Sequence, residues 1–206
     1  MGKDDLRHLI TELQHAYSGE LAASYAYRGH WKSVRDAAER EEIRKIENDE
    51  WHHRALVADM LQKLGARPLP IRDAIFFTIG RVLGAACHIS GWFLPMYGAW
   101  RLEQQNVEEY ERAAQFARGC GHEELIPCLK EMADVEREHE RYFGAKVSGG
   151  RRGKKVVLAS VQVADLAADL RVDAVEGKLA GDTDRVLDGE SVGAAVADDA
   201  SAVDSK

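Results

Sequence analysis

The chain has 206 residues, of which 45% are hydrophobic and 31% charged, a composition that favours a single soluble helical domain over a membrane protein. Its net charge of -7 argues against a nucleic-acid-binding protein, because neutralising phosphates requires a basic face. The three cysteines form no Cys-x-x-Cys pair, and the polar start MGKDDLRH lacks the apolar core of a signal peptide. We therefore expect a cytoplasmic protein with no nucleic-acid partner.

A first amphipathic helix is expected to start at Asp4 or Asp5, both good capping residues, and to run for about thirty residues. Its apolar side chains recur at steps of three and four between Leu6 and Val34. Glu20 occupies the one wider gap in this pattern, where the helical period requires a core-facing apolar residue. A carboxylate at that position indicates a role other than packing.

A second helix is predicted between Asp36 and Gly65, because Asp is a favoured N-cap residue and Gly a standard residue after a helix end. Glu50 and His53 interrupt its apolar face. They form a Glu-x-x-His motif, and residues three apart share one face of a helix. Two prolines within residues 65–70 then prevent the helix from continuing.

Residues 73–100 are the most apolar part of the chain, although Arg81 and His88 interrupt them and Pro95 breaks them. A transmembrane helix needs roughly 20 clean apolar residues, which this segment does not offer. We expect a crossover helix that is either buried in the protein or lies in a membrane interface.

The next helix carries apolar side chains on one face between residues 97 and 117. Among its several acids, Glu103 is the one that lies on this face. Glu109 is six residues further on, about 240° around the helix axis, and should point away.

The last strong helical pattern spans residues 125–143, and a second Glu-x-x-His motif, Glu136 and His139, lies on its apolar face. The sequence beyond this helix is dominated by Ala, Val, Asp and Gly and lacks aromatic residues, which indicates a weakly ordered tail. The predicted division is a helical bundle over residues 1–147 and a low-complexity tail over residues 148–206.

Six polar residues thus occupy core-facing positions. Burying four ionised carboxylates without partners would cost more than the stability of a small domain, so cations must compensate them. One Glu from each of two helices, with Glu-x-x-His from each of two others, forms the dinuclear site of ferritin-like bundles. The similar spacings, 30 residues from the first Glu to the second and 33 from the third to the fourth, indicate two helical hairpins joined by the crossover. The predicted ligands are Glu20, Glu50, His53, Glu103, Glu136 and His139.

Mixed carboxylate and imidazole ligands suit iron or manganese better than zinc. We therefore expect two iron ions, with manganese as the alternative, in an all-α, ferritin-like antiparallel four-helix bundle with an apolar crossover helix and a weakly ordered C-terminal tail. Two ferrous ions can together deliver two electrons to O₂, and the surrounding pocket selects the outcome. Asp49 is a candidate for orienting one of the imidazoles.

These residues resemble the demethoxyubiquinone hydroxylases of ubiquinone biosynthesis. That family implies a membrane-associated di-iron monooxygenase, which adds a hydroxyl group to the quinone ring of a polyprenylated substrate with O₂ and an electron donor. The resemblance extends over residues 10–143 and rests on Gly19-Glu20 with Tyr27 and Gly29, Glu50 to His53, Arg67-Pro68 before the Gly- and Ala-rich crossover at residues 80–86, Glu103 with Tyr110, and Glu136 with His139.

The resemblance also implies that Tyr110 is a catalytic residue near the metal site and that residues 73–100 form a membrane-facing surface that admits the quinone. The protein would then be peripheral on the inner face of the cell membrane, and a homo-oligomer is compatible with this interpretation. Two features differ from the family: Glu109 stands where a His usually precedes the Tyr, and a polar tail follows the last helix in place of an apolar one.

Two other functions stay open at this point. A rubrerythrin- or ferritin-like protein would reduce peroxide or handle iron with the same metals, although the chain lacks the paired Cys-x-x-Cys motifs of a rubredoxin centre. A non-enzymatic helical interaction or membrane-surface module would carry these acids as structural residues. In that case Glu50→Ala or His139→Ala would change neither metal content nor stability.

Overall fold

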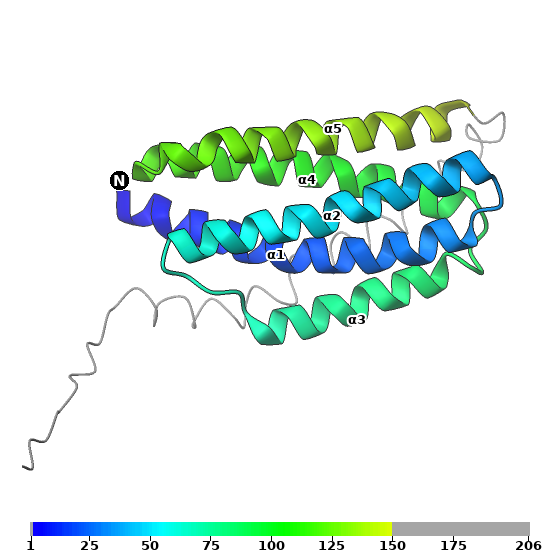
Figure 1. Cartoon of the computed structure of the whole chain (residues 1–206), viewed down its shortest axis with the longest axis horizontal. Coiled ribbons are helices and arrows are strands. Elements are labelled where there is room, and N and C mark those ends of the chain that lie inside the picture. Colours follow the sequence, from blue (N-terminus) through cyan, green and yellow to red (C-terminus); the bar gives the residue numbers. More distant parts are fainter. Residues whose placement is uncertain (1, 150–206) are drawn as a thin grey trace, which may run out of the picture.

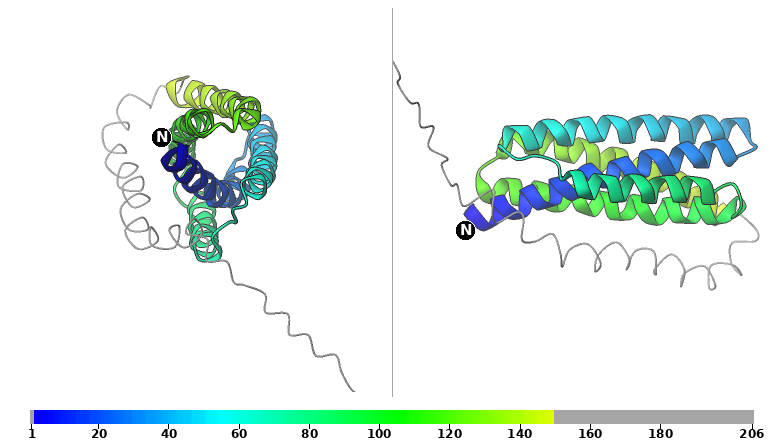
Figure 2. Two further views of the ribbon diagram at one scale, coloured as in Figure 1. Left: turned by 90° about the vertical axis from the view of Figure 1, so that its left-hand side faces the viewer. Right: turned by 90° about the horizontal axis from the view of Figure 1, so that it is seen from below.

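Residues 2–149 are described by the computed structural model and are almost entirely helical (Figure 1). Four long helices, each antiparallel to its neighbours, form a bundle, and α3 lies outside it against α1 (Figures 1 and 2). The predicted all-α bundle with a crossover helix is confirmed. The tail predicted from residue 148 onward lies outside the described residues, apart from its first two residues. The helices are α1 (Gly2–Ser33), α2 (Ala37–Lys63), α3 (Pro70–Ala86), α4 (Phe93–Cys120), the 3₁₀ helix η1 (Glu123–Leu125) and α5 (Ile126–Gly149).

The helix ends follow the capping signals of the sequence. The Asp36 side chain accepts a hydrogen bond from the Glu39 backbone N–H at 2.9 Å and so caps the start of α2. Gly65 follows the end of α2 with a φ of 69°, and Gly121 ends α4 with a φ of 82°. These left-handed conformations favour glycine, which has no Cβ to clash with the preceding backbone.

The crossover helix is shorter than the apolar segment 73–100. It ends at Ala86, and the chain turns through Gly91 before residues 93–100 begin α4. Pro95, expected to break the segment, lies instead in the first turn of α4, where a proline removes no intrahelical hydrogen bond. Within residues 2–149, no helix is both long enough and apolar enough to cross a membrane.

Close backbone contact holds α3 against α1. A Cβ atom added at Gly80 would lie 2.4 Å from the Ala22 carbonyl oxygen, and one added at Gly84 would lie 2.7 Å from the Tyr25 carbonyl oxygen. A Cβ at Gly29 of α1 would collide with the Gly84 backbone. Small residues therefore let the two backbones touch, and α3 stays fixed along the outside of the bundle.

The Gly80→Ala variant should be less stable than the wild type by about 1–3 kcal/mol, because the new methyl group would clash with the backbone of α1. Gly98→Ala is the matched control. Gly98 lies in α4 with no atom within 4 Å of the added Cβ, so alanine there should stabilise the helix by about 0.5–1 kcal/mol. Urea unfolding of both variants measures the difference, and equal stabilisation of the two would rule out the close approach.

The apolar core consists of two clusters, one toward each end of the bundle. Each long helix contributes to both clusters, and the polar residues predicted to bind metal lie between them along every helix. The core therefore encloses the site from both ends. The first cluster includes Leu9, Leu13, Val57, Leu61, Tyr110, Leu129 and Met132, and the second includes Tyr27, Ile43, Ile46, Met96, Tyr97 and Phe143.

Candidate metal centre

All six predicted ligands lie together in the middle of the bundle, with exposed fractions between 0% and 5%. Helices α1 and α4 each supply one glutamate, while α2 and α5 each supply a Glu-x-x-His motif. Their donor atoms form two overlapping groups, and within each group the atoms lie within 4.8 Å of one another. The first group is Glu20, Glu50, His53 and Glu136, and the second is Glu50, Glu103, Glu136 and His139.

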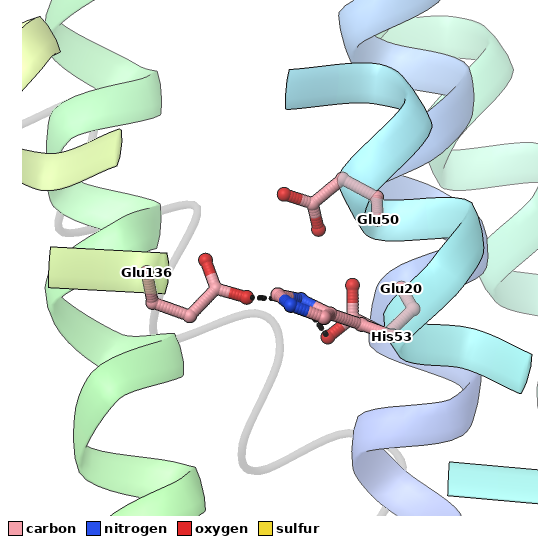
Figure 3. Close-up of side chains that lie close together, drawn as sticks. All are labelled: Glu20, Glu50, His53 and Glu136. Carbon is pink, nitrogen blue, oxygen red and sulfur yellow. Dashed lines mark hydrogen bonds and ion pairs between the residues drawn. The ribbon is translucent and has the colours of Figure 1, made fainter. Parts of the chain in front are cut away.

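In the first group, residues from three helices converge on one imidazole (Figure 3). Glu136 reaches from α5 toward His53 of α2, with its Oε1 2.8 Å from the imidazole Nδ1. Glu20 approaches the same nitrogen from α1, at 4.0 Å. Glu50 lies beside them and belongs to both groups. Glu50 and Glu136 are therefore the two residues that could contribute to both of two neighbouring cation sites.

In the second group, His139 presents Nδ1 to the carboxylates. This nitrogen lies 3.4 Å from Glu136 Oε2, 3.6 Å from Glu50 Oε1 and 3.9 Å from Glu103 Oε2. On its other side the ring contacts Asp49, whose Oδ2 lies 3.2 Å from Nε2. Asp49 thus stands in the position suggested for it by the sequence, because a carboxylate on the outer nitrogen fixes the orientation of a metal-binding imidazole.

Two buried tyrosines hold the glutamates of α1 and α4. The Tyr110 hydroxyl of α4 donates to Glu20 Oε1 on α1, and the Tyr27 hydroxyl of α1 donates to Glu103 Oε1 on α4. The family resemblance implies that Tyr110 lies near the site, whereas Tyr27 contributes to the apolar face and to the resemblance of the first helix without being assigned a role. One signal was available: each tyrosine follows a predicted ligand on its own helix by seven residues, Glu20 to Tyr27 and Glu103 to Tyr110.

Several buried atoms of the site have no hydrogen-bond partner. They are Glu20 Oε2, both Glu50 oxygens, Glu136 Oε2 and His139 Nδ1. Leaving such atoms unpaired is costly, and cations between the carboxylates would satisfy all of them at once. The donor set of oxygens and imidazole nitrogens also fits iron or manganese. These residues therefore fit the metal pair that the sequence predicts.

Burial raises the pKa values of three of the four carboxyl groups, Glu20, Glu50 and Glu103. The cause is the loss of water around the ionised form, and for Glu50 and Glu103 the neighbouring Glu136 adds repulsion. A divalent cation among these groups would favour the ionised forms instead. Metal binding at this site should therefore release protons.

The fourth carboxyl group behaves in the opposite way. Burial would raise the pKa of Glu136, but the imidazoles of His139 and His53 outweigh it, and this pKa lies below its usual range. Burial likewise would lower the pKa of His139, yet Asp49 and Glu136 raise it to about 9. Glu136 is therefore the one carboxylate of the site that the surrounding protein groups themselves keep ionised.

Glu109 lies outside both groups of candidate ligands, as its helical phase indicates. Its Oε1 lies 2.5 Å from Nδ1 of His15 on α1, and both side chains are partly exposed. The His15 ring in turn packs edge-on against Phe76 of α3, with ring centroids 5.6 Å apart. An imidazole thus does lie beside residue 109, but it comes from a neighbouring helix.

An antiparallel four-helix bundle with two Glu-x-x-His motifs and two further glutamates in its core is the arrangement of ferritin-like dinuclear carboxylate proteins. Residues 7–111 match the family model described as ubiquinone biosynthesis protein COQ7, and the chain belongs to this family. The match covers most of α1, all of α2 and α3, and most of α4. Glu136 and His139 on α5 lie beyond it, and it is the structure that brings them to the other four residues.

The chain is also similar in sequence to two curated proteins. The 3-demethoxyubiquinol 3-hydroxylase of Cupriavidus necator is 28% identical over 158 residues, which cover 73% of this chain and 70% of that protein. The protein of the same name from Chromobacterium violaceum is 28% identical over 85 residues, 41% of each chain. No solved structure matches the chain significantly.

Proposed function

We propose that this chain is an O₂-dependent monooxygenase that hydroxylates the ring of a demethoxyubiquinol-like, lipophilic substrate. The reaction converts a ring C–H to C–OH, with one oxygen atom of O₂ entering the product and the other leaving as water. This balance takes two electrons and two protons from an electron donor. The observation that carries the proposal is the buried six-residue site, with its unpaired donor atoms, inside a member of the COQ7 family.

The six residues would hold two iron ions, with manganese as the alternative metal. When bound, two ferrous ions supply two electrons for the activation of O₂. The protein contributes the closed surroundings, because the two apolar clusters flank the site and exclude water from it. Tyr110 is the candidate catalytic residue: its hydroxyl holds Glu20, and its ring packs edge-on against His53 at a centroid distance of 5.9 Å.

The names of both relatives and the family match favour hydroxylation over peroxide reduction or iron handling. A direct test reconstitutes the full chain with ferrous iron and supplies O₂, a chemical reductant and a short-chain demethoxyubiquinol. We expect a product heavier by one oxygen atom, measured by mass spectrometry. Iron-loaded protein that leaves the quinol unchanged would refute the proposal. Oxidation of its ferrous form by peroxide faster than by O₂ would support the peroxide-reducing alternative.

The substrate would reach the site from a membrane surface contacted by α3. Large apolar side chains are exposed along this helix, in the turn after it and at the start of α4. Soluble proteins rarely expose so many large apolar residues in one region unless the surface contacts a partner or a membrane. The other face of α3 packs against α1, one of the four helices of the site. A lipid surface would cover this apolar face and concentrate a polyprenylated quinol beside the bundle. The exposed residues are Ile71, Ile75, Phe77, Val82, Leu83, Ile89, Trp92 and Leu94.

A variant with Ile71→Gln and Val82→Gln should bind phospholipid vesicles at least about tenfold more weakly than the wild type, because each change removes an apolar group worth about 1.5–3 kcal/mol when buried. These side chains are 67% and 62% exposed, so the fold should tolerate both changes. Co-sedimentation with vesicles of phosphatidylcholine and phosphatidylglycerol measures the effect. Lys45→Gln, an exposed change on α2, is the control. Unchanged binding of the double variant would exclude α3 as the membrane contact.

A further inference from the structure

The two tyrosine–glutamate hydrogen bonds are related by an internal symmetry. Helices α1 and α4 are antiparallel neighbours, and in each of them a tyrosine follows a glutamate by seven residues, or two helical turns (Figure 1). Glu20 and Tyr27 on α1 therefore lie opposite Tyr110 and Glu103 on α4. The hydrogen bonds run crosswise, so each helix positions the glutamate of the other.

The surroundings of Tyr27 fix its ring independently of the carboxylates. The ring stacks on Phe143 of α5, with centroids 5.7 Å apart and an angle of 5° between the ring planes. Phe143 follows His139 by four residues, so the helix that supplies His139 also holds Tyr27. Tyr27 is 2% exposed, and the stack leaves its hydroxyl directed at Glu103.

This hydrogen bond distinguishes the two oxygens of Glu103. Tyr27 donates to Oε1, whereas Oε2 accepts a hydrogen bond of 3.4 Å from the Asn106 amide nitrogen and lies 3.9 Å from His139 Nδ1. The contact to Asn106 is at the long limit for a hydrogen bond, so Oε2, which is also the oxygen facing His139, is the one that could turn to a cation.

We propose that Tyr27 is a positioning residue, which holds Glu103 so that Oε2 faces the group formed by Glu50, Glu136 and His139. This role rests on the proposed metal site and adds to it a residue outside the six ligands. It also predicts that the two cations respond separately to the two tyrosines. Tyr27 acts on the half of the site that contains Glu103, and Tyr110 acts on the half that contains Glu20.

Titration of the metal-free full chain with Mn²⁺, followed by the electron paramagnetic resonance signal of unbound Mn²⁺, tests this role. The wild type should bind two ions. Tyr27→Phe should weaken one of the two dissociation constants about 10–100-fold and leave the other within twofold, because loss of a group that orients a ligand typically costs that much. Tyr97→Phe is the matched control, since Tyr97 is a buried α4 tyrosine for which no hydrogen bond to the six residues is seen.

A Glu103→Gln background separates positioning from packing. If Tyr27 acts through Glu103, adding Tyr27→Phe to that variant should leave the affinity for the remaining ion unchanged, whereas adding Tyr110→Phe should weaken it. A Tyr27→Phe variant with both wild-type constants, or one whose effect persists in the Glu103→Gln background, would overturn the proposal. Failure of the wild type itself to bind two ions would instead overturn the proposed metal site.

Discussion

Glu136→Ala should abolish binding of both metal ions, whereas Glu103→Ala should cost only one. Glu136 belongs to both groups of donor atoms and is fully buried, while Glu103 belongs to one group. Metal content after anaerobic loading with ferrous iron should fall from two ions per chain to none for Glu136→Ala. Loss of a residue that only orients a metal ligand typically costs up to about 100-fold. Loss of a ligand shared by both ions should cost more, so hydroxylase activity should fall by more than about 100-fold.

Glu138→Ala is the control for this experiment. Glu138 lies on the same helix two residues further on, and its side chain is 73% exposed. Its removal should leave two ions bound and the activity within about twofold, as is usual for surface changes. Retention of two ions by Glu136→Ala, with circular dichroism showing an intact helical fold, would exclude Glu136 as a shared ligand. Loss of both ions from Glu103→Ala would show that the two halves of the site do not fill independently.

Helical phase alone was enough to select the residues that the fold brings together. Each of the six interrupts an apolar face, and a face that is buried along its whole length must bury the interruption too. The same reasoning separated Glu103 from Glu109, which lies outside both groups of donor atoms. That the six residues ligate metal stays a prediction, which the metal content of the Glu136 and Glu103 variants tests.

Contacts between helices could not be predicted, because they depend on how far one helix slides along another. This register decides that Tyr27 meets Glu103, that His15 meets Glu109, and that Glu136 is shared by both groups. No periodicity within one helix contains that information. The end of the crossover helix could not be predicted either. The apolar segment 73–100 contains the end of α3, the turn after it and the start of α4, and the hydrophobic pattern does not change where α3 ends at Ala86.

The pH dependence of stability should contain a contribution from His30, which is buried against Tyr27 and Phe143. Burial alone lowers the pKa of His30 from 6.5 to about 4, and its Nε2 has no hydrogen-bond partner. The folded protein thus binds a proton at His30 more weakly than the unfolded chain does. The corresponding stability is fully present above pH 6.5 and is lost as the pH falls from 6.5 through 4.

This loss should amount to about 3 kcal/mol, since one pKa unit corresponds to about 1.4 kcal/mol. His30→Phe keeps an aromatic ring in the stack but cannot take up a proton. The two proteins are compared by urea unfolding in their metal-free forms at pH 7 and pH 4, so that acid release of metal does not contribute. The carboxyl groups of the site titrate in both proteins, so their contribution to the pH dependence cancels in the difference between the two proteins.

Between pH 7 and pH 4 the wild type should lose about 3 kcal/mol more stability than His30→Phe. Parallel pH profiles for the two proteins would mean that acid reaches His30 without cost, and that the ring is not buried as the structure places it.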